Sequence, residues 1–433
     1  MSLAATVPKH EAMRNSGAEW LGNIPDDWES KRMKFLFRDH SRKGMPDAEL
    51  LSVTQNQGVV PRTWVGNRMV MPSGNLESFK FIEEGDFAIS LRSFEGGLEY
   101  CHHDGIISPA YTVLKQRSDG LIAGYYRYLF KSAAFISELQ TSVVGIREGK
   151  NISFEELAYS LMPIPSSTEQ RAIAAFLDGK CAGLDEAVRI KEAQIALLRE
   201  RRQILIQQAV TRGLNPAAPM KDSGIDWIGQ IPAHWKLKKL KYVSNALRTG
   251  RTPPTDSSID HFDDGTVCWY TPGDFKEDGE FQGAEKLISP KTAKAGFVDI
   301  YPENSVYFVG IGGTLGRVNI SRVRASCNQQ FNVILPSEET ASELVLFWLM
   351  ANRESIYYLT DFSTMPIRNQ SQTKNIPIPC PPASEQEQIV EFVQNAIVQI
   401  RQIISIKEDQ VTALKEYKSS LINAAVTGKV KVV

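Results

Sequence analysis

The sequence predicts an α+β protein in which two mixed α/β globular domains are separated by two long helices. The helices are expected to pair as an antiparallel coiled coil and to give the molecule pseudo-two-fold symmetry. The first observation behind this prediction is an internal duplication, because residues 16–28 return in recognisable form as residues 223–235. The second is a pair of proline-free segments of about 45 residues, in which apolar side chains recur at alternating steps of four and three.

The duplication extends along both halves of the chain. A Glu-Gln pair at 169–170 recurs at 385–386, and residues 205–211 match residues 421–427. Short repeats of 20 to 50 residues are typical of solenoids, whereas two copies of roughly 210 residues indicate the tandem duplication of a whole unit. A monomer built in this way can carry a pseudo-two-fold axis, as a dimer carries a true one. The expected layout is an N-terminal segment 1–27 equivalent to 208–234, a first globular domain 28–166, a long helix 167–213, a linker 214–234, a second globular domain 235–383, a second long helix 384–428 and a tail 429–433.

Each globular domain is expected to mix short strands with helices. Runs rich in β-branched and aromatic residues, punctuated by Gly and Pro, predict strands at 50–54, 86–90, 267–270, 305–309 and 331–335. Helices are predicted at equivalent places in the two copies, 121–140 and 342–359. Both domains end on the phrase Pro-Ile-Pro, which does not permit a helix until it has passed.

The two long helices begin at a hydroxyl residue followed by Glu and Gln, which is an N-cap signal. Their apolar spacing is that of a coiled-coil seam, and a helix of 45 residues is about 68 Å long. The alternative is that each helix packs only against its own domain. The expected seam residues are Leu177, Leu184, Val188, Ile195, Leu198 and Leu205 in the first helix and Val393, Ile397, Ile400, Ile404, Val411, Leu414 and Leu421 in the second.

Bulk composition excludes several classes of protein. The 433 residues are 42% hydrophobic and 23% charged, as in ordinary globular proteins, and no apolar run reaches the length of a membrane span. The start of the chain does not read as a signal peptide, and the five scattered cysteines favour free thiols in the cytoplasm. A net charge of −1 argues against non-specific coating of nucleic acid, although it leaves room for a basic face.

Motifs for catalysis or for metal binding are not found. There is no phosphate-binding G-x-x-x-x-G-K-[ST] loop, and the glycine-rich segment 310–316 is followed by a strand pattern, so it is interpreted as a β-turn. The segment 215–219 reads as the stop after the first long helix, and His102-His103 lacks partners at metal-ligand spacing. We therefore expect no catalytic residue, no metal and no cofactor bound by this chain.

Polar side chains that can read base edges do cluster in loop-like segments. Arg, Asn and Gln can each make two hydrogen bonds to a base in the major groove, whereas lysines suit phosphates. Lysine and arginine at 31, 32 and 34 and lysines at 236, 238, 239 and 241 are the phosphate candidates, although ordinary polar surface has the same composition. The base-reading candidates are Gln55, Asn56, Gln57, Arg62, Arg92, Arg147, Lys150 and Asn151 in the first copy and Arg248, Arg251, Thr252, Arg317, Asn328, Gln329, Arg368 and Asn369 in the second.

Several short sequence phrases occur in a characteristic order along the chain. They are the twin S-G-x-[ED]-W-[LI]-G-x-I-P-x-x-W phrases and the paired Pro-Ile-Pro and Glu-Gln signals, with Thr-Gly-Arg-Thr-Pro at 249–253, Trp-Tyr-Thr-Pro-Gly-Asp at 269–274, Cys-Asn-Gln-Gln at 327–330 and Ala-Ala-Val-Thr-Gly-Lys at 424–429. In these phrases the chain resembles the specificity (S) subunits of type I restriction-modification enzymes. The first copy has residues 39–43 where the second has the Thr-Gly-Arg-Thr-Pro turn, so the two domains have diverged.

The resemblance implies two target recognition domains, each of which reads half of an asymmetric bipartite site in double-stranded DNA. It also implies two methyltransferase (M) subunits that dock on the helices, and nuclease/translocase (R) subunits that join them. The chain itself would be non-catalytic, while S-adenosylmethionine, ATP and Mg would act in the partner subunits of an adenine methyltransferase and ATP-dependent endonuclease. Two other hypotheses are a two-armed scaffold that binds proteins rather than DNA, and an enzyme whose site no motif reveals.

Overall fold

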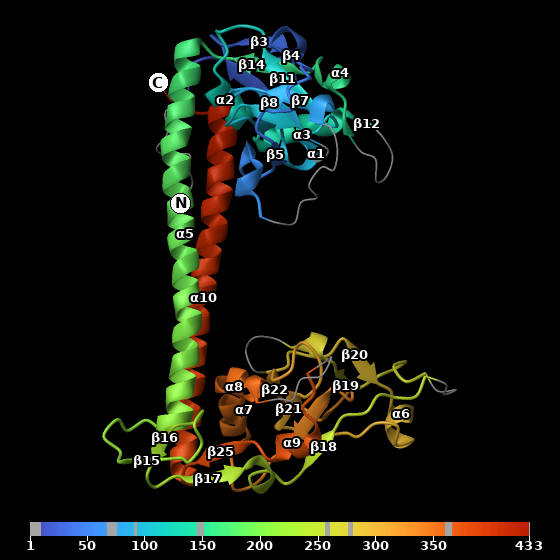
Figure 1. Ribbon diagram of the computed structural model, residues 1–433, viewed down its shortest axis with the longest axis vertical. Helices are drawn as coiled ribbons and strands as arrows, with labels where there is room; N and C mark the ends of the chain where they lie inside the picture. The colour runs from blue at the N-terminus through green and yellow to red at the C-terminus, as the bar shows by residue number, and fades with distance from the viewer. Residues whose placement is uncertain are drawn as a thin grey trace. The chain divides into compact units, whose positions relative to one another are not determined.

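The computed structural model describes residues 10–66, 76–90, 93–144, 151–255, 260–275, 280–359 and 366–432. The chain forms two compact units. Unit 1 comprises Met1–Glu192 with Asp409–Val433, and unit 2 comprises Ala193–Glu408. The two predicted long helices are present as α5, Ser167–Arg212, and α10, Ala383–Val426, drawn in green and red in Figure 1. Each unit therefore contains one globular domain and a part of both long helices.

The globular domain of unit 1 is built on an antiparallel sheet of four strands in the order β4-β11-β8-β9. Hairpins β1–β2 and β5–β6 and the pairs β3–β14, β7–β10 and β12–β13 complete it. Its strands are β1 Met13–Asn15, β2 Asn23–Pro25, β3 Glu29–Arg32, β4 Phe37–Asp39, β5 Leu51–Thr54, β6 Gly58–Pro61, β7 Lys80–Ile82, β8 Phe87–Ile89, β9 Glu99–Tyr100, β10 Gly105–Ile107, β11 Thr112–Gln116, β12 Val143–Val144, β13 Asn151–Ile152 and β14 Leu161–Ile164. Its short helices are α1 Ser93–Gly96, α2 Ala123–Leu129, α3 Ala133–Thr141 and α4 Phe154–Leu157.

The globular domain of unit 2 repeats this framework. Its four-stranded antiparallel sheet has the order β18-β24-β21-β22, and a second sheet, β20-β19-β23, contains one parallel pair. Its strands are β15 Met220–Asp222, β16 Gln230–Pro232, β17 Lys236–Lys239, β18 Leu247–Thr249, β19 Val267–Tyr270, β20 Lys286–Ile288, β21 Ser305–Val309, β22 Val318–Ser321, β23 Ala325–Cys327, β24 Phe331–Ile334 and β25 Pro377–Cys380. Its short helices are α6 Pro290–Lys294, α7 Ser342–Ala351, α8 Arg353–Tyr358 and α9 Gln370–Lys374.

The structure confirms the predicted strands, and it shows two consecutive helices where the sequence predicted one at 121–140 and one at 342–359. Strands β5, β8, β19, β21 and β24 lie where expected, and the glycine-rich segment 310–316 is the loop of the β21–β22 hairpin. The first predicted helix is two helices because Ser132 accepts a hydrogen bond from the N–H of Phe135 and starts α3 afresh. The second is divided at Asn352, whose side chain donates to the carbonyl of Trp348 and so satisfies the end of α7.

The duplicated sequence phrases build the same joint between domain and long helix in each unit. The indole N–H of Trp28 donates to Glu169 of α5 at 2.9 Å, and that of Trp235 donates to Glu385 of α10 at 3.0 Å. Both indoles are buried, so an unpaired N–H there would be costly. The repeated tryptophan and glutamate therefore fasten each domain to the beginning of a long helix.

The glutamine after each glutamate completes the joint. The side-chain oxygen of Gln170 accepts from the N–H of Ile122 at 2.8 Å, and its nitrogen donates to the carbonyl of Pro165 at 2.9 Å. Gln386 makes the equivalent bonds to Ala341, at 3.0 Å, and to Pro381, at 3.0 Å. Gln170 thus links the start of α2 to the segment before α5, and Gln386 links the start of α7 to the segment before α10.

The predicted seam residues are all buried or half-buried. In unit 1, Lys418 contacts Asp185 at 2.7 Å and Lys415 contacts Glu192 at 3.0 Å, so these parts of α5 and α10 run in opposite directions. In unit 2, an apolar cluster contains Ile195, Leu198 and Leu205 with Ile400 and Ile404. Regular knobs-into-holes packing of the two helices stays a prediction.

No helix among the described residues combines the length and the apolar character that crossing a lipid bilayer requires.

Candidate nucleic-acid interface

The β5–β6 turn of unit 1 presents the three predicted amide side chains Gln55, Asn56 and Gln57, all of which are exposed. The hydroxyl of Thr54 closes the turn, because it donates to the carbonyl of Gly58 at 3.0 Å and accepts from the N–H of Gln57 at 3.1 Å. Glycine is required at 58, where φ is +74° and a Cβ atom would lie 2.5 Å from the carbonyl oxygen of Tyr100.

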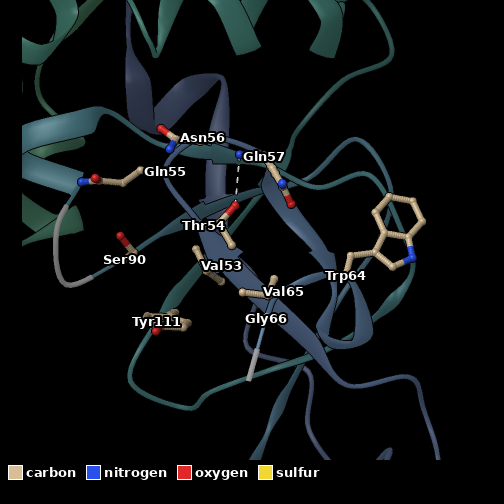
Figure 2. A pocket seen from close by; sticks show the side chains of 10 residues that line it. All are labelled: Val53, Thr54, Gln55, Asn56, Gln57, Trp64, Val65, Gly66, Ser90 and Tyr111. Carbon is tan, nitrogen blue, oxygen red and sulfur yellow. Dashed lines mark hydrogen bonds between the residues drawn. The ribbon is translucent and has the colours of Figure 1, made fainter. Parts of the chain in front are cut away.

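The turn borders a hollow of about 640 Å³. Figure 2 shows the amide side chains on the turn and the indole of Trp64 to one side of it. Trp64 is 62% exposed and meets the ring of His103 edge-to-face at 5.0 Å between centroids. Amides that can bond base edges thus lie beside an exposed aromatic face on which a base can stack. The lining residues are Val53, Thr54, Gln55, Asn56, Gln57, Trp64, Val65, Gly66, Ser90 and Tyr111.

Sequence reasoning missed Trp64 and Tyr111. The available signal was an aromatic residue close to a predicted polar cluster, since Trp64 follows the candidate Arg62 by two positions. Arg62 itself is half-buried, and its guanidinium donates to the hydroxyl of Ser52 at 3.4 Å. Candidates Arg92, Arg147 and Lys150 lie outside the described residues, as does the side chain of Asn151 in β13.

An ion pair between a half-buried lysine and a buried carboxylate supports the turn. The ammonium group of Lys131 contacts Glu99 at 2.7 Å and also donates to the carbonyls of Gly96, at 2.8 Å, and Gln55, at 3.1 Å. Burial raises the pKa of Glu99, and the charge of Lys131 partly opposes that rise. The pair therefore holds the backbone of Gln55 at a fixed place on the domain.

In unit 2 the structure brings four predicted residues together. The turn after β18 packs against the loop before β24, where the N–H of Arg251 donates to the carbonyl of Cys327 at 2.9 Å. The hydroxyl of Thr252 donates to the side-chain oxygen of Gln329. Asn328 is held by its backbone N–H, which donates to the carbonyl of Tyr270 at 3.1 Å. Arg251, Thr252 and Gln329 are exposed on this surface, as is the nearby Arg248.

The charge of Arg251 is partly balanced. Its guanidinium lies 3.8 Å from the carboxylate of Asp299, and both side chains are about half exposed. The indole N–H of Trp269 donates to the carbonyl of Arg251 at 3.2 Å, which fixes the backbone of the turn. An exposed ion pair of this kind is weak, so the guanidinium is available to a stronger acceptor such as a base edge or a phosphate.

The remaining candidates of unit 2 lie elsewhere on the domain. Arg368 is half-buried and donates to the carbonyl of Ile356 at 3.3 Å. The side chain of Asn369 accepts from the N–H of Gln372 at 2.9 Å and caps α9. Arg317 is exposed and follows the β21–β22 loop, where it lines a hollow of unit 2. Arg368 and Asn369 therefore have roles within the framework that their residue types did not reveal.

The basic residues predicted to contact phosphates lie in β3 and β17 and in the short 3-10 turns that follow these strands. Lys31 pairs with Glu29 at 2.7 Å, and Lys34 lies over the ring of Tyr159 at 4.4 Å. In unit 2, Lys238 lies 3.6 Å from Glu339, and Lys241 lies over the ring of Tyr242 at 4.9 Å. These contacts are local surface contacts, and they leave the phosphate role as a prediction.

Comparisons with known proteins agree with this architecture. Residues 232–412 match the sequence model of the type I restriction modification DNA specificity domain. The chain is 23% identical, over 94% of both lengths, to the type I restriction enzyme MjaVIII specificity subunit of Methanocaldococcus jannaschii. It is 30% identical over 167 residues to the MjaIX specificity subunit of the same organism, a match that spans 37% of this chain and 38% of that relative.

Solved structures share the fold. One chain, from work described as the structural basis of complex assembly and conformational transition of the type I R-M system, matches with a TM-score of 0.73 and 14% identity, over 93% of this chain and 98% of that one. The crystal structure of the HsdS subunit from Thermoanaerobacter tengcongensis matches with a TM-score of 0.54 and 15% identity, over 94% of this chain and 98% of that one. This chain is therefore similar to the specificity subunits of type I restriction enzymes over nearly its whole length, and residues 232–412 match the type I restriction modification DNA specificity domain.

Proposed function

We propose that this chain is the DNA sequence-specificity subunit of a type I restriction-modification complex, and that each globular domain reads one half of an asymmetric bipartite site. One observation carries the proposal: the two domains share a framework and differ in the loops set on it. Unit 1 presents the amides at 55–57 beside an exposed tryptophan, and unit 2 presents Arg251, Thr252 and Gln329. Because the two domains present different polar side chains on the same framework, they are expected to recognise different base sequences.

The long helices supply the second part of the proposal, which is that they set the spacer between half-sites and dock two methyltransferase subunits. Large apolar side chains are exposed along these helices in unit 2, and exposed apolar surface is typical of protein–protein contact. They are Leu197, Ile204, Phe392, Val398, Ile403 and Ile406. The nuclease/translocase subunits would join through the methyltransferases.

The chain is proposed to be non-catalytic by itself. S-adenosylmethionine for adenine methylation, and ATP and Mg for the nuclease, would be bound by the partner subunits. What this chain contributes is the choice of the DNA sequence at which those subunits act.

An exchange of domains tests the proposal. Replacing residues 28–165 with the equivalent segment of a relative should change one half of the methylated sequence and leave the other half and the spacer unchanged. A matched exchange of residues 235–383 should change only the opposite half. Genome-wide mapping of methylated adenines measures both outcomes, and a change in both halves or in neither would contradict the modular reading.

A salt titration separates this function from that of a protein-binding scaffold. The assembled complex should bind a duplex that carries its site more tightly than a matched random duplex at physiological salt. A scaffold that does not read DNA would bind the two duplexes equally at every salt concentration.

A further inference from the structure

A second hollow, of about 370 Å³, lies in unit 2, and none of its described lining residues belongs to the turn that carries Arg251. Its walls are α5, the end of the β21–β22 hairpin and the junction of α7 with α8. Four arginines line it: Arg199 and Arg202 from α5, Arg317 from the hairpin, and Arg353 from the start of α8. None of its described lining residues carries a carboxylate. We call this site the arginine hollow.

The walls of the arginine hollow are fastened to one another. The side-chain amide of Gln203 on α5 donates to the carbonyl of Ala351 at the end of α7, at 3.2 Å. The guanidinium of Arg353 donates through Nε to the carbonyl of Leu315 at 3.4 Å. Glycine at 316 permits this approach, because its φ is +82° and a Cβ there would lie 3.0 Å from Cγ of Arg353.

The positive charge in the hollow is incompletely balanced. Burial and the nearby cation of Arg317 lower the pKa of Arg353, and the adjacent Glu354 opposes that effect. Arg199 contacts Glu408 at 3.2 Å, but both side chains are about half exposed, so solvent weakens the pair. Four arginines that share one hollow and are only weakly balanced by acids favour the binding of an anion.

A buried amide adds a further donor. Asn319 of β22 lines the hollow and is 1% exposed, and its Nδ2 has no hydrogen-bond partner among the described residues. A buried donor without an acceptor is costly, and an anion oxygen would satisfy it. The lining also includes Phe275 and Met350, which offer apolar surface beside the charges.

We propose that the arginine hollow binds a phosphate of the DNA backbone next to the half-site that unit 2 reads. Guanidinium forks match the two free oxygens of a phosphodiester, and Phe275 and Met350 offer a surface for the attached deoxyribose. Phosphate contacts position a protein on DNA without reading sequence. Arg317, predicted from sequence to read a base, is thereby assigned to the backbone. The inference rests on the proposed function, since it requires that this chain binds DNA.

The test uses Arg202→Gln and Arg317→Gln in the assembled complex, with Arg189→Gln as control. Arg189 lies on the same helix in unit 1, is 69% exposed and pairs with Glu186. Affinity is measured across a salt series for a duplex with the site and for a random duplex. In each hollow variant, the slope of log binding constant against log salt concentration should become shallower by about 0.9. Binding of both duplexes should weaken several-fold and by the same factor, while the methylated sequence stays unchanged. Arg317 is exposed and Arg202 is half-buried, so circular dichroism should show folded variants.

Three results would overturn the inference. An unchanged salt slope in both variants shows that the hollow does not contact phosphate. In a second outcome, the variants assemble poorly with their partner subunits when DNA is absent, while the complexes that do assemble bind DNA with the wild-type salt slope. That result assigns the hollow to an acidic surface of a partner subunit. A changed base preference assigns Arg317 to sequence reading. If the unaltered complex shows no preference for its site at any salt concentration, the proposed function itself fails, and that result is distinct from the other three.

Discussion

Single residues decide how firmly the loops that we propose to read DNA are held. Lys131 and Glu99 form a pair in which the carboxylate is fully buried, and the same ammonium group bonds the backbone of Gln55. The pairing of these residues could not be predicted from sequence, because 32 positions separate them and neither belongs to a motif. The strand β9 and the end of α2 bring them together only when the domain folds.

Replacing Lys131 with Met should destabilise unit 1 by about 3 kcal/mol, because it leaves a buried carboxylate unpaired. Urea unfolding measures the loss, and the double variant with Glu99→Gln should recover part of it. Lys43→Met, at an exposed lysine of the same domain, is the control and should be nearly neutral. An equal loss in the single and double variants would show that the unpaired carboxylate of Glu99 is not the cause of the destabilisation.

Asp86 gives the fold a pH dependence. Burial, together with the nearby Asp104, raises its pKa to about 7. A carboxyl whose pKa is higher in the folded state than in the unfolded state favours folding when protonated, so stability should fall as pH rises from about 4 to about 7. Asp86→Asn keeps an acceptor for the N–H of Glu83 and removes the charge. The variant should be more stable than wild type at pH 8, on the order of 2 kcal/mol, and about equal at pH 4.

Thermal unfolding at pH 4, 6 and 8 measures this effect, with Asp119→Asn at an exposed aspartate as control. A stability difference between Asp86→Asn and wild type that does not vary with pH would contradict the assignment.

At the scale of elements, the turn after β18 depends on a close backbone approach. A Cβ atom at Gly250 would lie 2.0 Å from the carbonyl oxygen of Asn328 and 2.5 Å from the sulfur of Cys327. The turn contains the Thr-Gly-Arg-Thr-Pro motif at 249–253. The structure shows that glycine is needed there because the backbone of the neighbouring loop leaves no room for a side chain. The loop of residues 327–330 packs against the turn, so the two polar segments form one surface.

Gly250→Ala should therefore cost about 2 kcal/mol in stability, since the turn must move away from the loop. It should also weaken recognition of the half-site assigned to unit 2 and spare the other half-site. The control is Gly313→Ala, where a Cβ atom would have no neighbour within 4 Å. Denaturant unfolding measures the first effect and methylation mapping the second. Normal recognition of both half-sites by a stable Gly250→Ala protein would show that this turn does not contact the DNA bases.

At the scale of the whole molecule, the helices are proposed to act as the spacer. Removing one heptad from α5 and the facing heptad from α10 keeps the apolar seam in phase and shortens each helix by about 10 Å. We expect the spacer in the methylated sequence to shorten by about three base pairs, at ~3.4 Å per base pair, while both half-sites stay the same. An unchanged spacer in a folded, active variant would refute this role for the helices.

The sequence by itself determined the duplication, both long helices and the chief strands. These features depend on local pattern: periodic apolar side chains, N-cap residues and Pro-Ile-Pro stops act over a few residues. The sequence also predicted that the amides at 55–57 and the polar residues at 251, 252, 328 and 329 lie in turns and loops, because such residue types concentrate there.

Only the tertiary structure decided which polar residues face outward as a group and which serve the framework. Arg368 and Asn369 have the composition of base readers, yet one bonds a carbonyl inside the domain and the other caps a helix. Trp64 lines the same hollow as the amides that precede it by a few positions, whereas Arg317 shares a hollow with three arginines from other elements that lie far from it in the chain. A residue's type fixes the bonds that it can make, whereas its neighbours in space fix which of those bonds are already made.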